Sequence, residues 1–217
     1  MTERPILFSG AMVRAILDGE KTQTRRVVKP TMTTPRIPPL HMELWIGVDG
    51  EQEVDESGLP CWLGFHPDYP GDAKWFSCPY GQAGDRLWVR ETLRRATDGT
   101  WYYAADDAPL LVRERDAAQA AAWAHHKEGD VCSSIYMPRW ASRITLEIVA
   151  VRVQRVQDIS IGDAMDEGVG FPKYSQFEKG SHLVGAFRDL WDSINAKSGY
   201  GWAVNPWVWA ITFRRAA

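Results

Sequence analysis

Hydrophobic residues recur with the spacing of an α-helix in three parts of the chain. A first helix is predicted to begin after Ser9 and to end before Gly19, because serine caps helix N-termini and glycine accepts the left-handed conformation that follows many helices. Residues 160–163 resemble a capping box, which predicts a short helix that ends at Glu167. The most regular stripe predicts a helix from 181 to 195 and consists of Leu183, Val184, Phe187, Leu190, Trp191 and Ile194.

Other parts of the chain alternate hydrophobic and polar residues with the period of a β-strand. Residues 21–28 are predicted to form a turn that enters a strand, and further strands are expected at 86–91, 101–104, 143–153 and 207–213. The alternation changes phase in the middle of 143–153, which predicts a β-bulge or a strongly coiled strand, as in a small barrel. The sum is a mixed α+β fold around a small, partly closed sheet.

Two regions interrupt this pattern. Residues 31–83 hold seven of the 13 prolines and two Lys/Arg against eight Asp/Glu, and no period persists there, so we interpret them as an irregular insertion. Residues 105–135 are a second excursion, with an Ala-rich stretch at 114–127 that favours a helix. We expect a single domain over 1–217, with the insertion as a lid over a pocket. Its aromatic residues would wall a channel for an acyl group: Trp45, Trp62, Phe65, Tyr69, Trp75 and Phe76.

Composition restricts the possible functions. The 217 residues are 45% hydrophobic and 24% charged, as in ordinary globular proteins. The formal charge of −3 disfavours extended binding along a nucleic-acid backbone, which usually requires a basic domain. The 11 tryptophans suit both a thick core and stacking on bases.

Cysteine usage and hydropathy set expectations for the cell compartment and for metals. The three cysteines, Cys61, Cys78 and Cys132, are widely spaced and match neither a disulfide framework nor a metal clip. This pattern predicts a protein of the reducing cytoplasm. No window reaches 18 apolar residues, so we expect no membrane span. Isolated histidines and the lack of a Cys pair predict no zinc site.

The residues with the most chemistry lie in the turn after the first helix. The segment 19–26 places an amine, hydroxyls and two guanidinium groups, those of Arg25 and Arg26, between a helix and a strand. Such a turn can direct several polar groups to one point, although a solvated basic strand would have the same composition.

Four segments together resemble an ASCH domain of the PUA-like superfamily, in the larger version found in phages and prophages. They are 19–26, 84–91, 163–168 and 205–209. The resemblance implies a small PUA-like β-barrel with flanking helices, here with the irregular Pro-rich insertion. It also implies an activity, because the family includes small amidohydrolases that remove the acyl group from N4-acetylcytidine. Those compact enzymes lack both the insertion and the Ala-rich excursion.

The resemblance also supplies candidate catalytic residues. Lys21 and Thr24 match the G-x-K-x-x-T motif of the amidohydrolases, and Glu167 matches their downstream glutamate. One mechanism uses the Thr24 hydroxyl as nucleophile with Lys21 as base; the other uses Glu167 to activate a water, with Lys21 stabilising the oxyanion. Neither mechanism uses a metal or a cofactor.

Six further residues are candidates for binding the substrate: Arg25, Arg26, Glu91, Arg139, Trp140 and Arg143. Aromatic and basic groups in 136–143 could support a base or a phosphate. The predicted function is therefore a metal-independent amidohydrolase of N4-acylated cytosine nucleosides, with at most weak binding of single-stranded RNA. The alternatives are a non-catalytic module that binds RNA or a modified base, and a ribonuclease.

Overall fold

The computed structural model describes residues 1–29, 41–44, 62–66, 69–126, 129–169 and 179–216, and at 41–44, 62–66, 69–76, 124–126 and 179–181 it describes the backbone alone. Its largest sheet has five strands in the order β1-β6-β10-β11-β2. These strands are β1 (Glu3–Leu7), β2 (Gln23–Val27), β6 (Arg86–Arg90), β10 (Thr145–Arg155) and β11 (Trp207–Arg215). β1 and β6 are parallel, and the other pairs are antiparallel.

The long strand β10 contains the predicted bulge. Its register with β11 shifts between Ile148 and Ala150, which leaves Val149 as the extra residue, 49% exposed. One extra residue reverses the side-chain alternation, and this accounts for the change of phase in the sequence. The bulge therefore lets both halves of β10 keep apolar residues on the buried face.

The predicted β-barrel is not observed as a closed sheet among the described strands. The five-stranded sheet ends at β1 on one side and at β2 on the other, and helix α1 (Gly10–Leu17) connects these two edges along the chain. Instead of a ladder, the Arg26 side chain bridges the edges: its Nη2 donates to the Leu7 carbonyl at 2.5 Å. The Ser9 hydroxyl caps α1, and Gly19 has φ 78°, as the sequence predicts.

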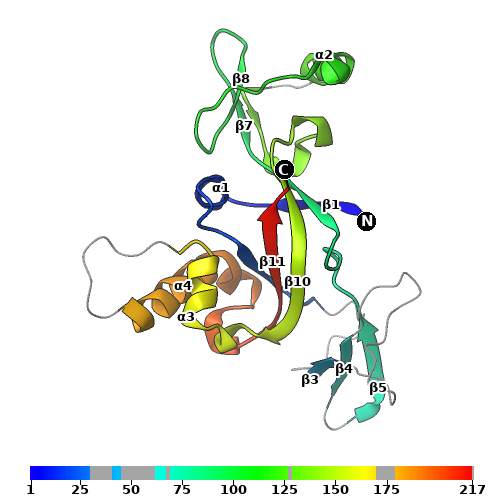
Figure 1. The fold of residues 1–217 in the computed structure, drawn as a ribbon, viewed down its shortest axis with the longest axis vertical. Helices are drawn as coiled ribbons and strands as arrows, with labels where there is room; N and C mark the ends of the chain where they lie inside the picture. The colour runs from blue at the N-terminus through cyan, green and yellow to red at the C-terminus, as the bar shows by residue number, and fades with distance from the viewer. Residues whose placement is uncertain (30–40, 45–61, 67–68, 127–128, 170–178, 217) are drawn as a thin grey trace.

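Helices α3 (Ile161–Asp166) and α4 (Lys179–Asn195) pack together beside the β11–β2 part of the sheet (Figure 1). The Ser160 hydroxyl accepts from the Asp163 backbone N–H, and the Asp163 carboxylate accepts from that of Ser160, which confirms the predicted capping box. The core under these helices consists of Val156, Ile159, Ala164, Leu183, Phe187, Trp191 and Val208.

The acidic, Pro-rich segment 31–83 contains strands. β3 (His41–Leu44), β4 (Trp62–His66) and β5 (Tyr69–Phe76) form a three-stranded antiparallel sheet. The prediction of an irregular segment is wrong for these residues, since aromatic side chains favour strands even without a clean alternation. In Figure 1 this sheet and helices α3 and α4 lie on opposite sides of β10 and β11. The predicted lid depends on side chains outside the described residues, and Trp45 lies wholly outside them.

A third sheet lies at the end of the molecule opposite to β3–β5 (Figure 1). It has the order β8-β7-β9, and its strands are β7 (Leu93–Arg95), β8 (Trp101–Tyr103) and β9 (Val131–Cys132). Helix α2 (Ala117–His126) occupies the Ala-rich stretch, as predicted. The excursion 105–135 thus supplies α2 and one strand of this sheet, around a core of its own that contains Leu93, Trp101, Tyr103, Cys132, Met137 and Ala141.

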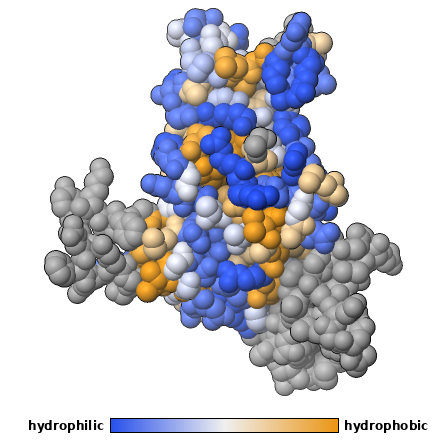
Figure 2. All heavy atoms as spheres, in the orientation of Figure 1, coloured by the Kyte–Doolittle hydropathy of each residue, from blue (hydrophilic) through white to orange (hydrophobic). Residues whose placement is uncertain are grey.

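Short 3-10 helices complete the described structure, at Glu114–Asp116, Ser134–Tyr136, Arg139–Ala141, Val156–Asp158, Ala196–Ser198 and Trp202–Val204. In the described part of the chain, no helix has the length and apolar character needed to cross a membrane. Figure 2 shows the face of the molecule that is seen in Figure 1, and on it hydrophobic side chains form separate patches divided by hydrophilic ones.

The end of α3 yields a prediction about stability. Gly168 has φ 73°, and a Cβ there would lie 2.9 Å from Lys21 Cβ and 3.0 Å from Ala15 Cβ. Gly168→Ala should therefore lower the free energy of unfolding in urea by about 1–3 kcal/mol. The control is Gly162→Ala on the same helix, where the nearest atom would be the Ser160 hydroxyl at 3.8 Å. That change should stabilise by about 0.5–1 kcal/mol. Equal effects at both positions would contradict the assigned close approach.

Candidate functional site

Lys21 and Glu167 form a buried ion pair between the start of β2 and the end of α3. Lys21 Nζ donates to Glu167 Oε2 at 2.7 Å, to the Glu167 carbonyl at 2.8 Å and to the Gln23 carbonyl at 2.7 Å. The Lys21 side chain is 0% exposed, and that of Glu167 is 4% exposed. Burial lowers the pKa of Lys21, and the Glu167 carboxylate acts against this by favouring the ammonium form. All three hydrogens of the ammonium thus have acceptors.

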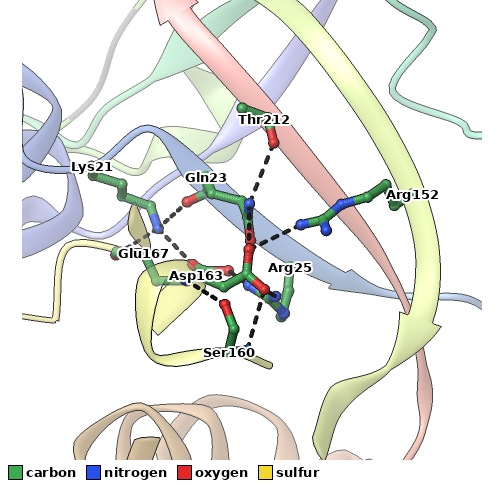
Figure 3. A network of polar contacts seen from close by, with 8 residues as sticks. All are labelled: Lys21, Gln23, Arg25, Arg152, Ser160, Asp163, Glu167 and Thr212. Carbon is green, nitrogen blue, oxygen red and sulfur yellow. Dashed lines mark hydrogen bonds and ion pairs between the residues drawn. The ribbon is translucent and has the colours of Figure 1, made fainter. Parts of the chain in front are cut away.

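Arg25 holds the second oxygen of the same carboxylate. Its Nη1 donates to Glu167 Oε1 at 3.1 Å and to Gln23 Oε1 at 2.6 Å. Its Nη2 lies 3.1 Å from Asp163 Oδ2, at ion-pair distance. Because Gln23 and Arg25 are two residues apart in a strand, their side chains share the face of the sheet that meets α3. Arg25 therefore connects carboxylates at both ends of α3 (Figure 3).

Asp163 is the outer anchor of this network. It accepts from Gln23 Nε2 at 3.0 Å, from Arg152 Nη2 at 2.9 Å and from the Ser160 backbone N–H at 3.2 Å. Burial alone would raise the pKa of Asp163, but these hydrogen bonds and the charge of Arg25 lower it to about 2. The network thus fixes α3, and with it Glu167, against β2.

A cavity of about 600 Å3 adjoins the ion pair. Thr24, Arg25, Arg26 and Glu167 line it, whereas Lys21 is buried behind Glu167 and does not. Among the described residues, no side chain or backbone group bonds to the Thr24 hydroxyl. Aromatic side chains line other parts of the wall, namely Tyr80, Phe187, Trp191, Tyr200 and Trp209. A volume of this size suits a small molecule.

Four of the predicted substrate-binding residues do not line this cavity. Glu91 is 1% exposed and is held by Arg143, which donates from Nε and Nη2 at 3.0 and 2.7 Å. Burial raises the pKa of Glu91, and Arg143 acts against this shift. Arg139 pairs with Glu3 at 2.6 Å.

The last of the four, Trp140, packs against the small core of the β8-β7-β9 sheet. Its ring lies edge-on to Trp123, with centroids 5.6 Å apart. The structure thus brings together Lys21, Thr24, Arg25, Arg26 and Glu167, and it separates them from Glu91, Arg139, Trp140 and Arg143.

Several residues at the site escaped the sequence analysis. Gln23 and Asp163 hold Arg25, and both lie in the ASCH-like segments 19–26 and 163–168, although neither is among the candidate site residues. Phe187 and Trp191 were interpreted as a core stripe, yet they also line the cavity. In the described part of the chain, no group of three or more His, Cys, Asp or Glu residues could hold a metal ion.

The fold and site define a mixed α+β protein in which a buried Glu–Lys–Arg cluster lies against a cavity. No protein-family model matches the chain, and no curated protein matches it significantly. Two solved structures are similar to it. One is an ASCH domain from Lactobacillus crispatus JV V101, 12% identical, with a TM-score of 0.38 over 99% of this chain and 79% of that chain. The other is protein EF3133 from Enterococcus faecalis V583, of family model DUF984, 8% identical, with a TM-score of 0.40 over 100% and 80%. Scores this low support no functional argument, so the ASCH resemblance rests on the sequence motifs.

The separate Glu91–Arg143 pair predicts a large loss of stability. Arg143→Met leaves Glu91 buried without its cation and should lower the free energy of unfolding in urea by about 3–5 kcal/mol. Arg139→Met is the matched control, because the Arg139 and Glu3 side chains are 40% and 38% exposed and such a pair contributes at most about 1 kcal/mol. A loss of at most about 1 kcal/mol in Arg143→Met would contradict this prediction.

The lowered pKa of Asp163 predicts that the free energy of unfolding decreases at acid pH. Its pKa of about 2 lies below the ordinary value of 3.8, so its stabilisation is present above about pH 4 and is lost as the pH falls through about 2. The contribution is on the order of 2 kcal/mol. Urea unfolding of the native protein and of Asp163→Asn should therefore differ most at pH 6 and converge toward pH 2. A difference that does not change with pH would contradict this assignment.

Proposed function

We propose that the protein is a metal-independent amidohydrolase that removes the acyl group from N4-acylated cytosine nucleosides. The observation that carries the proposal is the Glu167 carboxylate, which lines the same cavity as Thr24 while two cations, Lys21 and Arg25, hold its two oxygens. The resemblance of these residues to the amidohydrolase motif of ASCH domains supports the same activity. The five aromatic residues of the cavity wall suit a planar base.

The geometry supports a particular division of roles. Lys21 donates all three hydrogens to oxygen atoms, so it acts as an ammonium that holds Glu167 in place rather than as a base. Glu167 then takes the proton from the attacking oxygen, which belongs to Thr24 or to a water. The new bond forms at the acyl carbon, and Glu167 returns the proton to N4 as the C–N bond breaks.

The two routes differ in their second half. If Thr24 attacks, the acyl group is first esterified to its hydroxyl and a water then releases the carboxylic acid. If a water attacks, the acid leaves directly. Both routes consume one water and yield a cytosine nucleoside.

Two near-isosteric substitutions test the proposal. Glu167→Gln should reduce the rate of N4-acetylcytidine hydrolysis, followed by ultraviolet absorbance, by about 10²–10⁴-fold, since the proton shuttle is lost. Thr24→Val should do the same if Thr24 is the nucleophile, and should leave most of the rate if a water attacks. The control is Glu147→Gln, whose carboxylate pairs with the exposed Arg214 away from the cavity. It should keep the native rate.

The outcome that would overturn the proposal is a native protein that leaves N4-acylcytidines intact. Should that protein bind single-stranded RNA below micromolar concentration at physiological salt, the non-catalytic binding module would be the better interpretation. Full activity in Glu167→Gln would instead show that another carboxylate acts.

A further inference from the structure

β2 lies at an edge of the main sheet, so β11 pairs with only one side of its backbone. The ladder continues past both ends of β2. The Val28 N–H donates to the Trp207 carbonyl at 2.9 Å, and the Phe213 N–H donates to the Thr22 carbonyl at 2.8 Å. Residues 22 and 28 are both even-numbered, and bonded residues alternate along an antiparallel strand. The even-numbered residues of β2 therefore bond to β11.

The odd-numbered residues turn their backbone N–H and C=O groups toward the open side. The Gln23 carbonyl there already accepts from Lys21 Nζ. Within the described part of the chain, the backbone groups of Arg25 and Val27 have no hydrogen-bond partner. Two donors and two acceptors are thus available to a ligand at this edge.

The cavity runs along this same edge. Every residue from 24 to 29 lines it. Because side chains alternate between the two faces of a strand, an unbroken run of lining residues indicates that the backbone edge itself forms the wall. The rings of Tyr80, Phe187 and Trp191 line the same cavity and can contact the faces of a flat ligand.

The open edge is short. Lys21 and Glu167 form an antiparallel bridge just before β2, and Lys21 covers the Gln23 carbonyl. From Arg25 to Val27 the strand spans two residues, or about 7 Å at ~3.4 Å per residue. An added peptide strand requires a longer run of free groups. One heterocyclic ring with a donor beside an acceptor fits this length.

We propose that this edge binds the Watson–Crick edge of the pyrimidine, with the Arg25 carbonyl accepting from N4–H and the Val27 N–H donating to N3. The identity of the base rests on the proposed function. Arg25 comes first along the strand and its side chain touches Glu167. This order places N4, where the acyl group is attached, at the Glu167 end of the cavity.

A double-mutant cycle between protein and ligand tests the bond to N3. Val27→Pro removes the N–H, and proline is tolerated where an edge strand turns its N–H away from the ladder. 3-Deazacytidine has C–H in place of N3. Calorimetry on the native protein should give about five- to tenfold weaker binding for 3-deazacytidine than for cytidine. In Val27→Pro the two nucleosides should bind within about twofold of each other.

Val27→Ala is the matched control, since it shortens the side chain but keeps the N–H, and it should retain the native preference for cytidine. A preference that persists in Val27→Pro would overturn the inference. So would a native protein that does not bind cytidine at millimolar concentration, or one that binds both nucleosides equally.

Amide hydrogen exchange on valine-labelled native protein avoids any problem with the folding of Val27→Pro. The Val27 amide should exchange more slowly once cytidine is added, and less so with 3-deazacytidine. The Val28 amide is the internal control, because it bonds to Trp207 with or without ligand. Unchanged Val27 exchange at saturating cytidine would overturn the inference.

These measurements use a product and not a substrate, so they are separate from catalysis. Coupling between Val27 and N3, in a protein that does not hydrolyse N4-acetylcytidine, would support the binding edge and overturn the amidohydrolase. Hydrolysis of N4-acetylcytidine without coupling between Val27 and N3 would support the amidohydrolase and overturn the binding edge.

Discussion

The carboxylate of Glu167, buried between two cations, is the interaction on which the site depends. Removing three charged groups from water is costly, and their attraction compensates only when the remaining hydrogen-bond capacity is also satisfied. Here Lys21 uses all its hydrogens, and Arg25 reaches Glu167, Gln23 and Asp163, but among the described residues Arg25 Nε and Nη2 are buried without a hydrogen-bond partner. Well-packed hydrophobic residues often stabilise a fold as well as such a cluster does. A buried charge cluster that lines a cavity is therefore better explained by chemistry than by stability.

A single strand organises this arrangement. The side chains of Gln23 and Arg25 project from one face of β2 to hold α3, while Thr24 projects from the other face. The backbone divides in the same way, with bonds to β11 at even-numbered residues and, among the described residues, free groups at Arg25 and Val27. A strand in the interior of the sheet would have partners on both sides, so the edge position of β2 is what makes its backbone available to a ligand.

The sequence predicts the parts of this structure that depend on local rules. The caps of α1 and α3 and the bulge in β10 follow from Ser9, Ser160 and the change of alternation in 143–153. The motif resemblance selected Lys21, Thr24 and Glu167, which the fold brings to one place. What local rules cannot supply is pairing between distant residues. The contact between Arg25 and Asp163 joins positions far apart in the chain. The strands β3–β5 depend on pairing with one another, and their sequences show no regular alternation of hydrophobic and polar residues that would predict it. The closed barrel failed for the same reason, because closure is set by the whole sheet and not by any one strand.

Among the described residues, three buried carboxylates are held by arginine, those of Asp85, Glu91 and Glu167, and only Glu167 lies at the cavity. Glu91 is as deeply buried as Glu167, and Arg143 binds it through two hydrogen bonds while the Arg143 guanidinium lies 3.8 Å from the centre of the Tyr103 ring. Burial and charge therefore do not by themselves identify a catalytic group. Glu91 lies between the end of β6 and the small core of the β8-β7-β9 sheet, and both of its carboxylate oxygens accept hydrogen bonds from Arg143. Glu167 has the same kind of partners, but it also lines a cavity that a substrate can enter, and Thr24 lines the same cavity. Access, added to burial, is what distinguishes the carboxylate that we propose as catalytic from the structural one.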